Sequence, residues 1–123
     1  MSTSTIETLV GVWGTHNPGG GTDETLVLFP DGAGALDYYN MGGYCGRETF
    51  RWAAEDTHLR FEGYINIFRV ETAEFEIEDY VRPDEVRTKM LSVFPKGREA
   101  GPERFIKFGL VESYEIPKEA RER

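Results

Sequence analysis

The side chains with the clearest chemical potential in this chain are two histidines and one cysteine. His16, His58 and Cys45 lie far apart in the sequence and show none of the spacings of a zinc site. Cys45 has only Arg47 as a basic neighbour, so a loop or packing thiol is favoured over a nucleophile. A mixed site of histidines and carboxylates is the weaker alternative. We therefore expect no metal site and no cofactor.

One carboxylate could face the interior of the fold. Residues 66–80 show the clearest alternation in the chain, and Asp79 has the same parity as the apolar Phe75 and Ile77. A buried carboxyl group would have a raised pKa and could act as a general acid or base. A solvated carboxylate at the strand end is the favoured alternative, because aspartate is rarely fully buried. The opposite, solvated face of this strand carries Glu74, Glu76 and Glu78.

Aromatic residues make up 13% of the chain, and many fall on strand-like segments. Phe50 and Trp52 share one face of a segment, and Leu59 and Phe61 share one face of the next. Such a set is more often core than ligand pocket, although a small barrel can hold one ligand. Tyrosines suit a pocket mouth and a wet rim equally. The residues that we predict to line a ligand site are Tyr38, Phe50, Trp52, Phe61, Phe75, Thr88, Met90, Phe108 and Tyr114.

Eight strand-like segments, joined mostly by short turns, would position these side chains. A capping box at Ser4 and Glu7 predicts one helical turn over about residues 5–9, which would plug one end of a barrel. The glycine-rich loop 17–21 precedes no helix, so a phosphate-binding loop is not indicated. A second glycine-rich loop covers residues 41–46. The expected strands cover residues 9–15, 24–29, 34–40, 47–53, 58–64, 66–80, 85–94 and 104–116.

The turn signals predict three hairpins. Asp31-Gly32 between apolar runs is a strong hairpin signal, and a turn over residues 30–33 would pair Phe29 with Gly34. A turn around Glu55-Asp56 would join the two aromatic segments. A turn over residues 81–84 would pair Tyr80 with Glu85. The last register would set Glu78 opposite Arg87 and Glu76 opposite Lys89 on the outer face, and Phe75 opposite Met90 and Ile77 opposite Thr88 inside.

The last expected strand shows apolar residues at alternating positions. Ile106, Phe108 and Leu110 share one face, which we expect to be the inward face, and Pro117 ends the strand. Closing about eight antiparallel strands removes both sheet edges. We therefore expect an all-β, antiparallel up-and-down barrel of about eight strands with a short N-terminal helical turn.

Length and charge bound the remaining possibilities. The 123 residues suffice for one domain, with loose tails at residues 1–4 and 118–123. The net charge of −8 argues against nucleic acid and anionic membranes, since both require a basic face. Neither a signal peptide nor a membrane-spanning apolar run is visible. A single cysteine fits a reducing compartment, so we expect a cytoplasmic protein.

Gly11-Val12-Trp13, on the first expected strand after a helical turn, resembles the Gly-x-Trp signature of lipocalin and calycin barrels. Residues 29–34 resemble the first hairpin of small bacterial lipocalin-like domains. The resemblance implies that Gly11 and Trp13 are structural residues at a closed barrel end. It also implies that a basic residue of the last strand covers Trp13, and either Arg104 or Lys107 fits that part. The chain is shorter than a secreted lipocalin and lacks its disulfide. The resemblance therefore supports the fold and does not extend to a secreted transport role.

Three functions compete on these grounds. We favour the binding of a small apolar or amphipathic molecule between Trp52, Phe61, Phe75 and Met90. The second is a cofactor-free cyclase or isomerase that holds an apolar substrate in a reactive conformation. Its candidate polar groups are Tyr38, Asp79 and Tyr114. The third is an interaction protein with a filled barrel, a partner surface at residues 41–46 and a possible homodimer.

Overall fold

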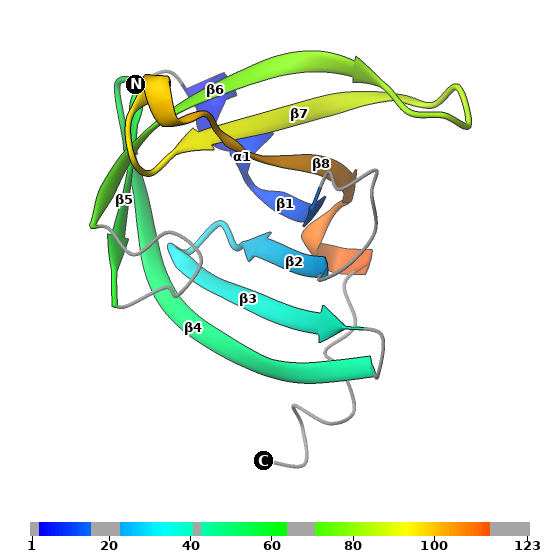
Figure 1. Ribbon diagram of the computed structural model, residues 1–123, viewed down its shortest axis with the longest axis horizontal. Coiled ribbons are helices and arrows are strands. Elements are labelled where there is room, and N and C mark those ends of the chain that lie inside the picture. The colour runs from blue at the N-terminus through cyan, green and yellow to red at the C-terminus, as the bar shows by residue number, and fades with distance from the viewer. Residues whose placement is uncertain (1–2, 16–22, 41–42, 64–70, 114–123) are drawn as a thin grey trace.

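The computed structural model describes residues 3–15, 23–40, 43–63 and 71–113. They form a closed antiparallel barrel in which each strand pairs with the next and the last pairs with the first (Figure 1). The strands are β1 (Gly11–Thr15), β2 (Asp23–Leu28), β3 (Ala33–Asn40), β4 (Gly43–Glu55), β5 (His58–Glu62), β6 (Thr72–Val81), β7 (Arg87–Phe94) and β8 (Glu103–Gly109). The helices are α1 (Thr3–Leu9) and the 3-10 turns η1 (Arg98–Ala100) and η2 (Val111–Ser113). The expected all-β up-and-down barrel with an N-terminal helical turn is confirmed.

Several strand boundaries differ from the expected ones. β4 begins at Gly43, so Cys45 lies on a strand rather than in a loop, and its side chain is exposed. Glycine has the same backbone N–H and carbonyl groups as other residues, so residues 43–46 can pair with β3. Their glycine-rich composition led us to expect a loop instead of a strand. β8 ends at Gly109 instead of residue 116, because η2 follows.

α1 and Trp13 close one end of the barrel. Leu9 at the end of α1 and Trp13 on β1 are both fully buried, and the Trp13 Nε1–H donates a 2.8 Å hydrogen bond to the Leu9 carbonyl. The Lys107 ammonium group lies 5.6 Å from the centroid of the Trp13 ring. It also donates a 2.8 Å hydrogen bond to the carbonyl of Thr8. Lys107 is therefore the basic residue that covers Trp13, whereas Arg104 pairs with Ser92 and is exposed.

One cluster of buried apolar side chains fills much of the barrel interior. Phe50 and Phe61 meet edge to face at 5.8 Å, and the Trp52 Nε1–H donates a 3.0 Å hydrogen bond to the Phe29 carbonyl. Phe50 lies over Gly34 of β3, where any Cβ atom would overlap the phenyl ring. The shared faces expected for β4 and β5 are confirmed. The core residues are Leu9, Trp13, Leu26, Leu28, Leu36, Phe50, Trp52, Leu59, Phe61, Ala73, Phe75, Leu91, Val93 and Phe105.

The expected register between β6 and β7 is wrong. Tyr80 pairs with Thr88, three positions beyond Glu85. The Arg82 N–H donates to the Val86 carbonyl at 2.9 Å, so residues 83–85 form a three-residue loop with Glu85 at φ 67°. A three-residue hairpin loop needs its last residue in the left-handed region, which is usually glycine. Because this position holds glutamate instead of glycine, the sequence gives no signal for a three-residue loop.

This register reverses the faces that we expected for β7. Leu91 and Val93 face the core, so Met90 and Thr88 face outward, and Lys89 faces inward. The Thr88 hydroxyl donates a 2.8 Å hydrogen bond to the Lys107 carbonyl. The ion pairs also change partners, because Lys89 pairs with Asp79, and Arg98 bridges Glu74 and Glu76.

The expected register between β2 and β3 is also wrong, by one residue. Leu28, not Phe29, pairs with Gly34, and Val27 pairs with Ala35. The Phe29 N–H donates to the Ala33 carbonyl at 2.9 Å, and Gly32 has φ 90°. The loop again has three residues, Pro30 to Gly32, instead of the four that we expected.

β8 also faces the opposite way from our expectation. Phe105 and Lys107 point inward, because they pair with Thr15 and Trp13 of β1. Phe108 falls at an irregularity in the β1–β8 ladder and is 54% exposed, and Leu110 is 64% exposed. The pattern of apolar residues predicted the wrong inward face, because the inward position 107 is occupied by the lysine that covers Trp13.

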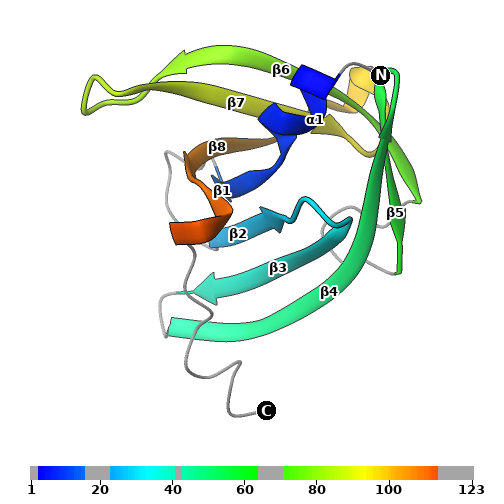
Figure 2. The same ribbon diagram turned by 180° about the vertical axis from the view of Figure 1, so that it is seen from behind.

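The β6–β7 hairpin extends beyond the rest of the barrel (Figure 1). β5 pairs only with residues 72–74 of β6, and β8 pairs only with residues 90–93 of β7. Figure 2 shows α1 in front of β6 and β7 at the end of the barrel where β1 begins. No helix in the described part of the chain combines the length and apolar character needed to cross a membrane.

Candidate ligand-binding site

A pocket of about 340 Å³ lies between α1 and the inner face of β6. Phe75 and Ile77 come from β6, and Thr5 and Thr8 come from α1. The remaining lining residues are Asp56 and Thr57 of the β4–β5 turn, Glu76 and Lys89. We call this the α1 pocket. It exists because the β6–β7 hairpin continues past the β4–β5 turn, so its inner face meets the helix instead of another strand.

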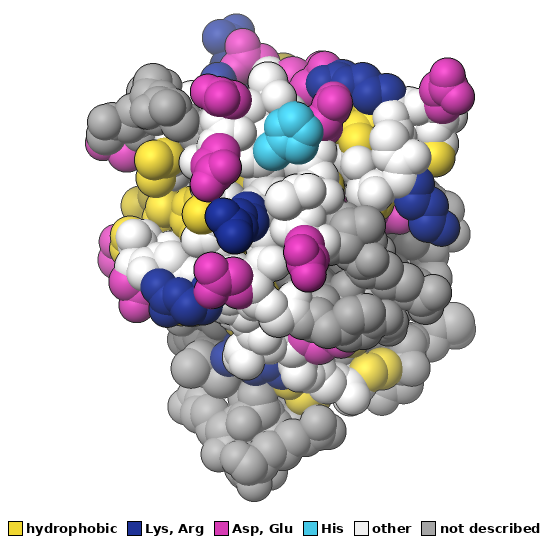
Figure 3. Space-filling model, turned by 90° about the vertical axis from the view of Figure 1, so that its left-hand side faces the viewer, with side chains coloured by type: hydrophobic (Ala, Val, Ile, Leu, Met, Phe, Trp, Pro, Cys, Tyr) yellow, Lys and Arg dark blue, Asp and Glu magenta, His cyan; other side chains and the backbone are white. Residues whose placement is uncertain are grey.

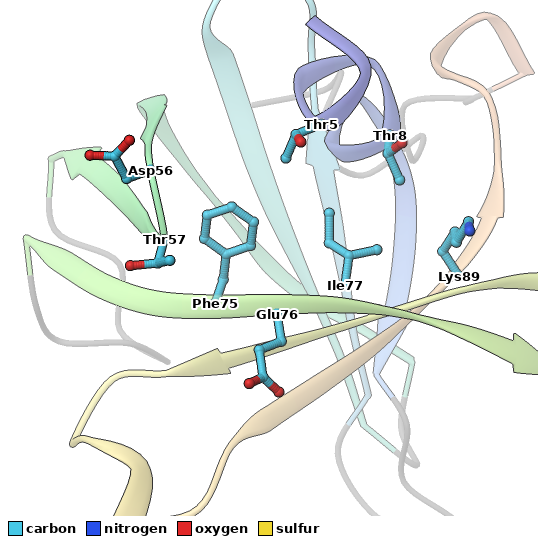
Figure 4. A pocket seen from close by; sticks show the side chains of 8 residues that line it. All are labelled: Thr5, Thr8, Asp56, Thr57, Phe75, Glu76, Ile77 and Lys89. Atoms are coloured by element: carbon cyan, nitrogen blue, oxygen red, sulfur yellow. The ribbon is translucent and has the colours of Figure 1, made fainter. Parts of the chain in front are cut away.

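The α1 pocket has an apolar floor and a polar surround. In Figure 4 the side chains of Phe75 and Ile77 lie side by side and point toward Thr5 and Thr8. Phe75 is 7% exposed and belongs to the core, so its ring joins the pocket floor to the barrel interior. The backbone also holds this corner together, because the Phe75 N–H donates a 2.9 Å hydrogen bond to the Thr57 carbonyl. The floor is therefore apolar and continuous with the core, and the surround supplies hydroxyl and charged groups.

Lys89 is the cation of the α1 pocket. Its ammonium group donates a hydrogen bond to the Asp79 carboxylate, and the two side chains form an ion pair. The hydrogen bond from Lys89, followed by the charge of Lys89, lowers the pKa of Asp79 below its usual value. The Asp79 side chain is 88% exposed. Asp79 is therefore a solvated carboxylate in its ionised form, as we favoured, rather than a buried general acid.

Lys107 lies deeper at the same end of the barrel and is half-buried. Burial lowers its pKa, because desolvation disfavours the charged ammonium form. Its side chain runs past Gly11, where a Cβ atom would lie 2.5 Å from the Lys107 Cε atom. Gly11 is thus needed for space, and Gly11, Trp13 and Lys107 form one structural unit.

The predicted ligand-binding residues do not lie together in the structure. Phe75 lines the α1 pocket, while Phe50, Trp52 and Phe61 lie in the barrel core away from it. Thr88 and Met90 face outward. Phe108 lines a second hollow of about 340 Å³ on the outside of the barrel, next to Gly14 and Thr25. Tyr114 and His16 lie outside the described residues.

Tyr38 points into the barrel far from α1. Its hydroxyl group donates a 2.6 Å hydrogen bond to a carboxylate oxygen of Glu48. Tyr38 pairs with Gly46 near the start of β4, whereas Asp79 lies on the hairpin beyond the other end of the barrel. The two residues therefore lie toward opposite ends of the barrel.

No group of three or more potential metal-ligating residues occurs within the described ranges. His58 lies on β5, where its Nδ1 is 3.2 Å from the hydroxyl oxygen of Thr57. On the side of the molecule that carries β5, acidic and basic side chains are interspersed (Figure 3). Arg60 and Glu55 form one of the ion pairs of β4 and β5, at 3.8 Å. The described part of this face therefore carries mixed surface charges that are exposed to solvent.

Sequence reasoning missed most of the α1 pocket. The register expected from the sequence places Lys89 on the outer face, because the wrong loop length reverses the parity of β7. Thr5, Thr8, Asp56 and Thr57 carry no motif of their own. A parity argument could have placed Glu48 inside, since it shares the face of Phe50 and Trp52. Only the position of α1 against β6 brings the pocket residues together.

Comparison of the chain with profiles of known protein families, with curated proteins and with solved structures found no match.

Proposed function

We propose that this protein binds a small amphipathic molecule in the α1 pocket. The observation that carries the proposal is a cavity of about 340 Å³ whose floor is made by the inward-facing Phe75 and Ile77. Sites for small molecules usually occupy about 300–1,000 Å³ and combine apolar lining with a few polar groups. The α1 pocket meets both conditions at the lower end of that size range, which favours a ligand of modest size.

The surroundings of the pocket support a binding role. Thr5, Thr8 and Thr57 supply hydroxyl groups that can fix the polar part of a ligand. The closed eight-stranded barrel and the Gly11-Val12-Trp13 signature also fit a lipocalin-like domain, whose barrels are suited to small molecules. The ligand sits beside α1 in this proposal, instead of between Trp52, Phe61 and Met90, because those side chains lie in the core or face outward.

A titration followed by NMR tests the proposal. Short-chain fatty acids, alkylamines and amphipathic alcohols are added while the Ile77 methyl and Phe75 ring resonances are recorded. We expect saturable shifts that centre on these two residues. Thr5→Trp should abolish them, because an indole on the inner side of α1 fills the cavity. Glu7→Trp on the exposed side of the same helix is the matched control and should bind normally.

A response spread evenly over the protein, or unchanged binding by the Thr5→Trp variant, would contradict the assignment of the ligand to this pocket. The absence of any saturable shift at Ile77 and Phe75 across the three chemical classes would contradict binding itself.

A further inference from the structure

The α1 pocket carries charges of opposite sign at its two ends. In Figure 4, Asp56 lies at one end and Lys89 at the other, with Phe75 and Ile77 between them. Glu76 points to the other side of β6, where its carboxylate pairs with Arg98. The charge of Glu76 is thus already matched outside the pocket, which leaves Asp56 and Lys89 as the charged groups at its ends.

Asp56 and Lys89 can each bind a charged group of a ligand. None of the ion pairs among the described residues includes Asp56, which sits at the β4–β5 turn with its side chain exposed. Lys89 pairs with Asp79, but an ammonium group has three donors and can serve a second carboxylate. The Lys89 side chain is 45% exposed, so a second anion can approach it from solvent.

We infer that the α1 pocket selects a zwitterion, with an ammonium group beside Asp56, a carboxylate beside Lys89 and an apolar chain over Phe75 and Ile77. Small ω-amino acids belong to this chemical class. The inference rests on the proposed function and adds the charge pattern of the ligand. A purely apolar ligand would leave both end groups unused, and a ligand with one charge would use only one of them.

The selectivity should be modest, because both end groups are partly exposed. Exposed ion pairs contribute roughly 0.2–1 kcal/mol each, so two of them raise affinity about two- to thirtyfold over an uncharged analogue. The preference should weaken as salt is added, since salt screens exposed charges.

The experiment compares matched probes by NMR titration of the wild-type protein. The zwitterions γ-aminobutyrate, δ-aminovalerate and ε-aminocaproate are each compared with the plain carboxylate and the plain amine of the same carbon skeleton. We expect the best-fitting zwitterion to bind more tightly than either of its analogues, with shifts centred on Phe75 and Ile77.

Variants assign each charge to its residue. Asp56→Asn should weaken binding of the zwitterions and amines and leave the carboxylates unchanged. Asparagine keeps the backbone, because Asp56 has φ 52° and asparagine tolerates that region. Lys89→Gln should weaken binding of the zwitterions and carboxylates only. Asp79→Asn should strengthen carboxylate binding, since it removes the competing partner of Lys89. Glu62→Gln, at the far end of β5, is the control and should change nothing.

Equal affinity for the zwitterion and both analogues, with shifts still at Phe75 and Ile77, would overturn the charge inference and leave the proposed function standing. Zwitterion binding that is insensitive to both Asp56→Asn and Lys89→Gln would also overturn it. A lack of shifts at Phe75 and Ile77 with every probe would overturn the proposed function together with the inference.

Discussion

Lys107 shows how one half-buried charge organises the closed end of the barrel. Its ammonium group meets the Thr8 carbonyl and the face of Trp13, and both interactions favour the charged form. Burial lowers its pKa, because desolvation disfavours the charged ammonium form. The residue therefore specifies the geometry of the closed end at a cost in solvation.

This balance predicts a pH dependence. The unfolded chain keeps a pKa near 10.5 at Lys107, and the folded protein has a lower one. Between the two values the unfolded state binds more protons, so the free energy of unfolding rises with pH in that window. The burial cost is full below the pKa of the folded protein and disappears as the pH approaches 10.5.

The measurement compares urea unfolding of the wild type and of Lys107→Met from neutral pH upward. We expect the wild type to gain stability relative to the variant as the pH rises. Lys96→Met, which removes an exposed lysine, is the matched control. A stability difference that stays constant or moves in the opposite direction would refute the buried-charge account.

Two turn residues adopt the same left-handed backbone with different side chains. Gly32 has φ 90° and Glu85 has φ 67°. A side chain in this region costs about 1–2 kcal/mol, while glycine loses about 0.5–1 kcal/mol in chain entropy. Glu85→Gly should therefore raise the free energy of unfolding by up to about 1 kcal/mol.

Gly32→Ala is the reciprocal change and should lower the free energy of unfolding by about 1–2 kcal/mol. Denaturant unfolding of both variants measures the pair. Stability losses in both variants, or a neutral Gly32→Ala change, would show that backbone strain does not govern these turns.

At the scale of elements, two hairpins repeat one turn. Pro30-Asp31-Gly32 and Pro83-Asp84-Glu85 each place aspartate in the middle of a three-residue loop. The aspartate side chain accepts a hydrogen bond from the N–H two residues later, at 3.0 Å in the first loop and 3.4 Å in the second. The second loop adds the Arg82–Asp84 ion pair at 2.6 Å. These local bonds stabilise the three-residue loops, and the loop length sets which residues face the core.

The contact between β3 and β4 yields a prediction at this scale. A methyl group at Gly34 would overlap the Phe50 ring, so Gly34→Ala should lower the free energy of unfolding by about 1–3 kcal/mol. Phe50→Leu in the same chain should restore part of the loss, because the smaller side chain leaves room. A double-mutant cycle by urea unfolding measures the coupling. Additive effects of the two substitutions would show that the ring does not limit the approach of the strands.

At the scale of the whole molecule, charge restricts the choice of partner. The net charge is −8, and acidic and basic groups are mixed on the face shown in Figure 3. We expect no binding of labelled duplex DNA or of anionic vesicles at physiological salt, as measured by fluorescence anisotropy and by sedimentation. Salt-sensitive binding of either partner would reveal a basic surface and contradict this expectation.

The sequence by itself determined the features that depend on neighbours along the chain. Period-two alternation placed Phe50, Trp52, Phe61 and Phe75 on shared faces, and the turn signals separated the strands of an up-and-down barrel. These predictions held because the pleat of a strand and the preference of glycine for turns are local properties.

Only the tertiary structure decided the strand register, the identity of the basic residue that covers Trp13, and the position of the α1 pocket. One extra or missing loop residue reverses the face of a whole strand, and Glu85 gave no glycine signal for the loop that moved Lys89 inward. The choice of Lys107 over Arg104 depends on its contact with Thr8, which lies 99 positions away along the chain. The α1 pocket likewise forms where α1 packs against the β6–β7 hairpin. The sequence pattern of either element alone does not show that the two come into contact.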